Sequence, residues 1–96
     1  MLDLAMVEVR IPSMLRAAMG GQKVVEARGS SVREVLEDLA RRYPGFGSSL
    51  FESDGSLRRF VNIYVNDEDI RFLGKLDTTL RQGDSVSILP AVAGGA

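Results

Sequence analysis

Residues 29–45 have the sequence GSSVREVLEDLARRYPG, which carries the clearest helical pattern in the chain. Ser31 is positioned to cap a helix, and Glu34, three residues later, completes the spacing of a capping box. Apolar side chains recur at helical spacing and form one stripe: Val32, Val35, Leu36, Leu39 and Tyr43. Charged residues occupy the other faces, and Pro44 and Gly45 stop the pattern. We therefore expect an amphipathic helix with one buried face and one solvated face.

Two strand patterns precede this helix. Residues 5–11, AMVEVRI, alternate between inward apolar side chains and outward ones, which is typical of a half-buried strand. Residues 22–27, QKVVEA, form a second short strand, and the glycine pair at 20 and 21 marks a turn before it. The opening of the chain is therefore predicted to be a hairpin with a long loop.

Three further strand patterns follow the helix. Residues 45–59 are rich in glycine, serine and charge, which predicts a loop that contains one helical turn around Leu50 and Phe51. Residues 60–66, FVNIYVN, alternate clearly, and a short strand is expected at residues 70–72. Residues 85–90, SVSILP, form the last strand, with Val86 and Ile88 facing inward.

The order of these elements defines a fold class. A hairpin, one helix and then more strands predict an α+β domain with a mixed sheet of four to five strands and one main helix across it. This layout is that of the β-grasp, or ubiquitin-like, fold. We expect residues 1–90 to form this domain and residues 91–96 to form a flexible tail.

Composition excludes several functions. The 96 residues include no Cys and no His, so the chain lacks a thiolate nucleophile and the commonest general base. An autonomous enzyme is therefore disfavoured. The net charge of −1 does not favour nucleic acid, and no apolar run has the length of a membrane span. No secretion signal begins the chain, so a cytoplasmic location is expected.

The acidic segment at residues 66–69, NDED, is a weak metal candidate. A calcium loop needs a longer ligand pattern with a glycine and a distal Glu, and this pattern is absent. A turn between strands explains the segment equally well. We expect no metal site.

Three apolar or aromatic side chains are predicted on the outward face of the sheet: Phe60, Tyr64 and Leu89. Scattered exposed apolar residues are normal. Aromatic residues gathered on one open face also suit a partner surface. Both interpretations stay open from the pattern alone.

The chain ends AVAGGA, after Pro90. Glycine has no Cβ, so the pair Gly94 and Gly95 can pass through a narrow channel. Small, flexible termini are also common without any function. The chemical alternative is that the backbone carboxylate at the end of the chain is the reactive group, so that the protein carries an acyl group rather than catalyses.

The C-terminal half resembles the small β-grasp sulfur carriers of the MoaD/ThiS family. The shared pattern is carried by Leu80, Gly83, Asp84, Val86, Ile88, Pro90, Gly94 and Gly95. The segments RFVNIYVNDEDIRF, GGQK and ILPAVAGG are similar to the actinobacterial carriers of cysteine biosynthesis, the CysO type, and the resemblance extends from about Val7 to Gly95.

The resemblance implies a reaction sequence in which partner enzymes do the catalysis. An E1-like adenylating enzyme activates the Gly95 carboxylate with ATP and magnesium, and sulfur then replaces AMP to give a thiocarboxylate. A PLP-dependent cysteine synthase uses that sulfur, and a zinc metalloprotease of the JAMM type cuts after the glycines. The carrier binds no cofactor and is a monomer when free. Ala91, Val92 and Ala93 thread the partner's active site, while Phe60, Tyr64 and Leu89 dock the domain.

Ala96 departs from the family pattern because it follows the glycine pair. We expect it to be a precursor residue that is removed before activation. The same carrier chemistry could also serve thiosugar or other secondary-metabolite synthesis, molybdopterin or thiamin. A ubiquitin-like protein modifier or a plain binding module is the remaining alternative.

Overall fold

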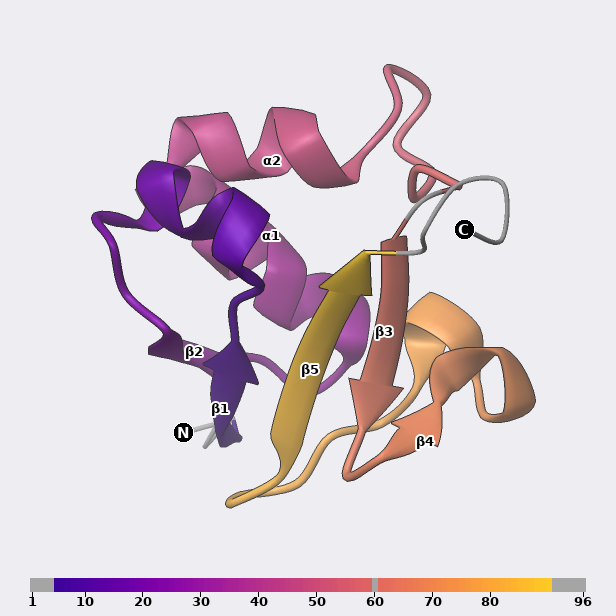
Figure 1. Ribbon diagram of the computed structural model, residues 1–96. Coiled ribbons are helices and arrows are strands. Elements are labelled where there is room, and N and C mark those ends of the chain that lie inside the picture. Colours follow the sequence, from indigo (N-terminus) through magenta and orange to yellow (C-terminus); the bar gives the residue numbers. More distant parts are fainter. Residues whose placement is uncertain (1–4, 60, 91–96) are drawn as a thin grey trace.

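The computed structural model describes residues 5–59 and 61–90, which form a mixed five-stranded sheet packed against helices (Figure 1). The strand order is β2-β1-β5-β3-β4. The strands are β1 (Met6–Arg10), β2 (Val24–Arg28), β3 (Val61–Val65), β4 (Glu68–Asp69) and β5 (Ser85–Pro90). β1 and β5 pair in parallel, and the other neighbours are antiparallel. The last strand of the chain is therefore the central strand of the sheet.

Helix α1 (Val32–Arg42) begins at the predicted cap. The Ser31 hydroxyl accepts a hydrogen bond from the Glu34 backbone N–H at 3.2 Å. The Glu34 carboxylate accepts hydrogen bonds from the Ser30 N–H and hydroxyl, each at 2.8 Å. The capping prediction is confirmed, with the difference that Glu34 reaches back to Ser30 rather than to Ser31. Two otherwise unpaired backbone donors at the start of the helix are thereby satisfied.

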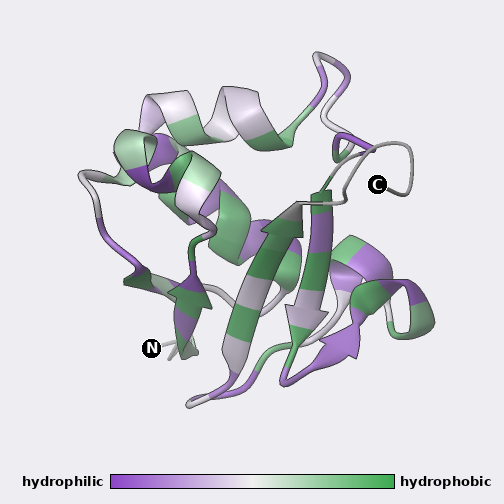
Figure 2. Ribbon diagram, viewed as in Figure 1, coloured by the Kyte–Doolittle hydropathy of each residue, from purple (hydrophilic) through white to green (hydrophobic). Residues whose placement is uncertain are grey.

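The core lies between α1 and the inner face of the sheet. The predicted inward residues are buried on both sides: Val32, Val35, Leu36 and Leu39 of α1, with Val7, Val9, Ile11, Ile63, Val65, Val86 and Ile88 of the sheet and its margin. Figure 2 shows green, hydrophobic bands along β5 separated by pale bands of nearly neutral hydropathy. Tyr43 and Val61 are only partly buried and pack at the edge of this core. The alternation and the helical stripe therefore placed the two faces correctly.

The prediction that residues 45–59 form a loop was wrong at its start. A second helix, α2 (Pro44–Leu50), begins at the proline that was expected only to stop α1. Proline is well tolerated in the first turn of a helix because its missing N–H would have no partner there. Phe46 and Leu50 of α2 are fully buried, so tertiary packing holds a helix whose sequence is rich in glycine and serine.

Two other segments also differ from the prediction. The expected strand at residues 70–72 is a 3-10 helix, η2 (Ile70–Phe72), and the edge strand β4 lies just before it. The long loop of the first hairpin contains another 3-10 helix, η1 (Ser13–Met19), which buries Met19, and a third, η3 (Lys75–Asp77), precedes β5. In η2, Asp69 caps the turn through the Arg71 N–H, a local side-chain bond that competes with strand pairing.

Replacing Gly29 with alanine is expected to destabilise the fold by about 1–3 kcal/mol. A Cβ at this position would lie 2.8 Å from both the Glu34 Cβ and the Val35 backbone nitrogen, so the start of α1 would have to move. Urea unfolding followed by circular dichroism measures the effect. Gly45→Ala is the matched control, because its Cβ would meet only the Ala18 Cβ at 3.6 Å. Equal stabilities for the two variants would show that α1 does not depend on close packing at Gly29.

Acid should weaken the start of α1. The hydrogen bonds from the Ser30 N–H and hydroxyl hold the pKa of Glu34 below its ordinary value. A carboxylate with a lowered folded-state pKa stabilises the fold above its unfolded pKa, and this stabilisation is lost as the pH falls through the folded pKa. Below about pH 4.3, the free energy of unfolding should therefore fall less steeply with decreasing pH in Glu34→Gln than in wild type. Glu37→Gln on the same helix is the control, and an identical pH profile for wild type and Glu34→Gln would contradict this account.

Candidate functional site

The site begins at the end of the central strand β5. Pro90, the last described residue, is in register with Val61 at the start of β3. The sequence predictions for Ala91, Val92, Ala93, Gly94, Gly95 and Ala96 concern residues that lie outside the described ranges. The sheet thus fixes the point from which the tail departs: the end of β5, between the end of β1 and the beginning of β3.

Tyr64 and Leu89 lie on the sheet face that α1 does not cover. Leu89 is in register with Asn62, two residues from Tyr64, so the two side chains share one face. Leu89 is 48% exposed and Tyr64 is half-buried. The predicted outward orientation is confirmed for these two residues, and Phe60 lies outside the described residues. Their role in docking stays a prediction.

A shallow hollow of about 450 Å³ lies beside these two residues, and we call it the Arg10–Leu89 hollow. It combines apolar and cationic side chains from β1, η1, β3 and β5. Arg10, Ser87 and Tyr64 form one row across three strands, since Arg10 is in register with Ser87 and Ser87 with Tyr64. The full lining is Arg10, Ile11, Pro12, Arg16, Tyr64, Asp67, Ser87, Ile88 and Leu89.

The two arginines of the hollow were not predicted as site residues. The alternation of residues along β1 already placed Arg10 on the open face of the sheet, so its position could have been predicted from the sequence. The position of Arg16 could not have been predicted in this way, because it depends on the 3-10 helix η1. There the Arg16 Nε–H donates a hydrogen bond to the Ile11 carbonyl at 3.0 Å. This bond orients the guanidinium and leaves its terminal N–H groups available. Within the described residues, neither arginine forms a salt bridge.

The acidic segment after β3, residues 66–69, forms a turn and makes hydrogen bonds with neighbouring residues. Asn66 and Asp67 have positive φ values of 50° and 72° and turn the chain into β4. The Asp69 carboxylate accepts hydrogen bonds from the side chain and backbone of Arg71, and these hold its pKa below the ordinary value. Across residues 5–59 and 61–90, no three His, Cys, Asp or Glu side chains come together in a way that could hold a metal ion.

Asn66→Ala is expected to lower the free energy of unfolding by about 1–2 kcal/mol. The Asn66 side chain joins the end of β3 to the start of β5: its Nδ2 donates to Asp84 and its Oδ1 accepts from the Ser85 N–H, both at 3.0 Å. Alanine would lose both bonds and would also tolerate the positive φ poorly. Urea denaturation measures the change. Asn62→Ala, which removes no side-chain hydrogen bond among the described residues, should cost less, and the reverse order would contradict the role of this link.

Among the described residues, no helix has both the length and the apolar character to cross a membrane.

The sheet with its open face and central last strand defines a β-grasp protein, and the sequence matches the pattern of the ThiS family over residues 9–95. The chain belongs to the ThiS family. It is 55% identical to the sulfur carrier protein CysO of Mycobacterium tuberculosis in an alignment of 91 positions that covers 93% of this chain and 98% of that protein. The resemblance and the fold predicted from sequence are thus confirmed, and this relative is named as a carrier rather than as an enzyme.

Two solved structures show the same fold. CysO in the Amycolatopsis orientalis BexX/CysO complex has a TM-score of 0.84 and 48% identity, covering 93% of this chain and 99% of that one. The small archaeal modifier protein 1 of Methanosarcina acetivorans has a TM-score of 0.88 and 33% identity, covering 98% of this chain and all of that one. The first is a carrier solved with another protein, and the second is named as a modifier.

Proposed function

We propose that this chain is a sulfur carrier for cysteine biosynthesis, which delivers sulfur from a thiocarboxylate formed at its own C-terminus. The observation that carries the proposal is the extent of the family match. It runs to residue 95 and so includes Gly94 and Gly95, which supports a role for the glycine pair in the family's chemistry. The match to CysO over 93% of the chain supports the cysteine pathway in particular.

The chemistry takes place on the backbone and so needs no nucleophilic side chain of this chain, which has no Cys or His. The Gly95 carboxylate attacks the α-phosphorus of ATP, held with magnesium by an E1-like enzyme, and pyrophosphate leaves. Sulfide then attacks the acyl carbon and AMP leaves. With a persulfide donor the outer sulfur attacks instead, and a thiol then cleaves the resulting acyl disulfide, which leaves one sulfur on the glycine and releases a disulfide. The product is a thiocarboxylate, a softer and stronger nucleophile than the carboxylate. The carrier is the substrate in both steps, and its partner is the catalyst.

The later partners take this sulfur onward. A PLP-dependent cysteine synthase supplies the acceptor for the thiocarboxylate, and a JAMM-type zinc metalloprotease releases the product from the glycine end. Ala96 has to leave before the first step, because otherwise the activated carboxylate would belong to the wrong residue. The β-grasp domain presents the docking face, and residues 91–96 are proposed to reach into each active site. All of these partners are cytoplasmic, and the carrier visits them as a monomer.

Protein modification is a second candidate because some relatives bear that name. The chain is 35% identical to the small archaeal modifier protein 3 of Haloferax volcanii, over 92% of this chain and 97% of that one. A modifier would use the same activated glycine but would transfer it to lysine side chains. The fold and the glycine pair suit both outcomes.

One experiment separates the two candidates. The chain with an N-terminal tag is expressed in its native host under sulfur limitation and analysed on denaturing gels with and without an immobilised organomercury reagent. A carrier gives one species that the mercury gel retards, because thiocarboxylate sulfur binds mercury. A modifier gives a ladder of larger, mercury-insensitive species that contain tag and target peptides joined at lysine. A single unretarded band of unchanged mass would contradict both.

A further inference from the structure

We propose that the Arg10–Leu89 hollow is an anchor point for a carboxylate on the partner enzyme, placed beside an apolar side chain at the mouth of that enzyme's active site. The proposal rests on the proposed function, because the partner is defined as the protein that receives the tail. Arg10 and Arg16 would bind the carboxylate, and Tyr64 and Leu89 would pack against the apolar side chain.

The length of the tail keeps the partner's active site near the hollow. Gly95 is five residues after Pro90, so it lies no more than about 18 Å from Pro90 even when the tail is fully extended. An active site that holds Gly95 must therefore bring its entrance close to the end of β5. Leu89, which lines the hollow, directly precedes Pro90 on that strand. A partner engaged with the tail therefore comes within reach of this part of the face.

The charges of the hollow select an anion. Arg10 is exposed on β1 and Arg16 is held by the Ile11 carbonyl, so two guanidinium groups line one hollow without a salt bridge among the described residues. Asp67 is the single acidic residue in the lining. Two arginines with uncommitted N–H groups suit a carboxylate, which accepts paired hydrogen bonds in the geometry that a guanidinium presents.

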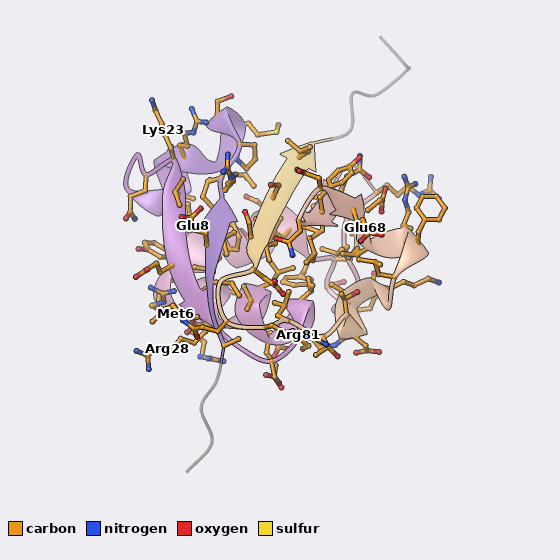
Figure 3. All side chains as sticks on the ribbon, turned by 90° about the horizontal axis from the view of Figure 1, so that it is seen from below. Met6, Glu8, Lys23, Arg28, Glu68 and Arg81 are labelled. Carbon is orange, nitrogen blue, oxygen red and sulfur yellow. The ribbon has the colours of Figure 1, made fainter. Side chains whose placement is uncertain are left out.

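The neighbouring row of the sheet has the opposite charge and would fix the orientation of the partner. Glu8 and Glu26 are directly opposite each other on β1 and β2, one row away from Arg10 and Val24. Figure 3 shows Glu8 between Lys23 at one end of this strand pair and Met6 and Arg28 at the other. A carboxylate that approached this row would be repelled, whereas at the Arg10–Leu89 hollow it would be attracted. Such alternation of charge determines how the partner is aligned on the sheet more than how tightly it binds.

Binding to BexX of Amycolatopsis orientalis tests this inference, because a CysO 48% identical to this chain was solved in complex with it. Isothermal titration compares wild type with Arg10→Glu, Arg16→Glu and Arg28→Glu. We expect each reversal in the hollow to weaken binding at least about tenfold and to reduce its dependence on salt. Arg28→Glu makes the same charge change on the same face outside the hollow, and it should stay close to wild type. Arg10→Lys should recover part of the loss.

Circular dichroism and urea unfolding show first that each variant is folded. Three results would each overturn the proposal. They are unchanged affinity in both hollow variants, an equal loss of affinity in Arg28→Glu, and no binding of wild type to BexX. The proposed function is judged separately by the sulfur content of wild type. A chain that carries no sulfur but binds BexX through Arg10 and Arg16 would contradict the carrier function and leave the anchor in place.

Discussion

A chain shortened by Gly94, Gly95 and Ala96 is expected to carry no sulfur, whereas a chain shortened by Ala96 alone should carry as much as wild type or more. The reason is that we propose the backbone carboxylate of Gly95 as the acceptor of sulfur, and the first deletion removes this group whereas the second exposes it. The fraction of thiocarboxylate in protein purified from the native host, measured by intact mass, reports both results.

The control for these deletions is the stability of the folded part. The described strand β5 ends at Pro90, so neither deletion removes a described residue. Both shortened chains should unfold at the wild-type urea concentration. Sulfur found on the chain that lacks the glycines would contradict the assignment of Gly95. Loss of sulfur from the chain that lacks only Ala96 would contradict its role as a removable residue.

Leu36→Ala is expected to destabilise the domain by about 2–5 kcal/mol, the typical cost of a leucine-sized cavity in a core. Leu36 is completely buried where α1 packs on the sheet. Small domains have a total stability of about 5–15 kcal/mol, so this one change removes a large share and leaves part of the protein unfolded at 37 °C. Urea unfolding and thermal melting measure the loss.

Leu89→Ala is the matched control for Leu36→Ala. It removes the same atoms from a side chain that is 48% exposed on the open face, so it should change stability by much less. It should instead weaken binding to the partner, since Leu89 lines the Arg10–Leu89 hollow. A loss of stability from Leu89→Ala as large as that from Leu36→Ala would show that the open face is part of the core.

The parts of the fold that were predictable depend on local periodicity. The cap at Ser31, the buried stripe of α1 and the inward residues of β1 and β5 follow from spacing alone, and the structure agrees with each. The order of these elements was then sufficient for the fold class, because one helix among strands has few ways to cover a sheet. The glycine pair could be recognised for the same reason, because it consists of two adjacent residues and needs no knowledge of tertiary contacts.

The parts that were missed depend on contacts between distant residues. Helix α2 is stabilised because Phe46 and Leu50 pack into the core. Its glycines and serines gave no local indication of a helix. The outer edge of β2 is another example. Arg42 donates to the Glu26 carbonyl at 2.7 Å and Asp38 accepts from the Arg28 N–H at 3.2 Å, so α1 side chains cover that edge. Such a cover hinders pairing with a foreign strand.

The candidate site divides in the same way. Tyr64 and Leu89 were predictable because strand alternation fixes their face, and the register of β3 with β5 brings them together. Arg16 was not predictable, since it joins Arg10 only through the fold of η1 and its bond to the Ile11 carbonyl. Tertiary structure therefore brings the two arginines of the hollow together, whereas the glycine pair proposed as the reactive end can be read directly from the sequence.

The most direct test of the carrier function is tandem mass spectrometry of the unaltered chain purified from its native host during sulfur-limited growth. The account predicts a chain that ends at Gly95, without Ala96, and in which one oxygen of the terminal carboxylate is replaced by sulfur. A cysteine adduct on the same glycine would assign the cysteine pathway. A population that retains Ala96 and contains only oxygen at its C-terminus, under conditions in which the cell is making cysteine, would contradict the account.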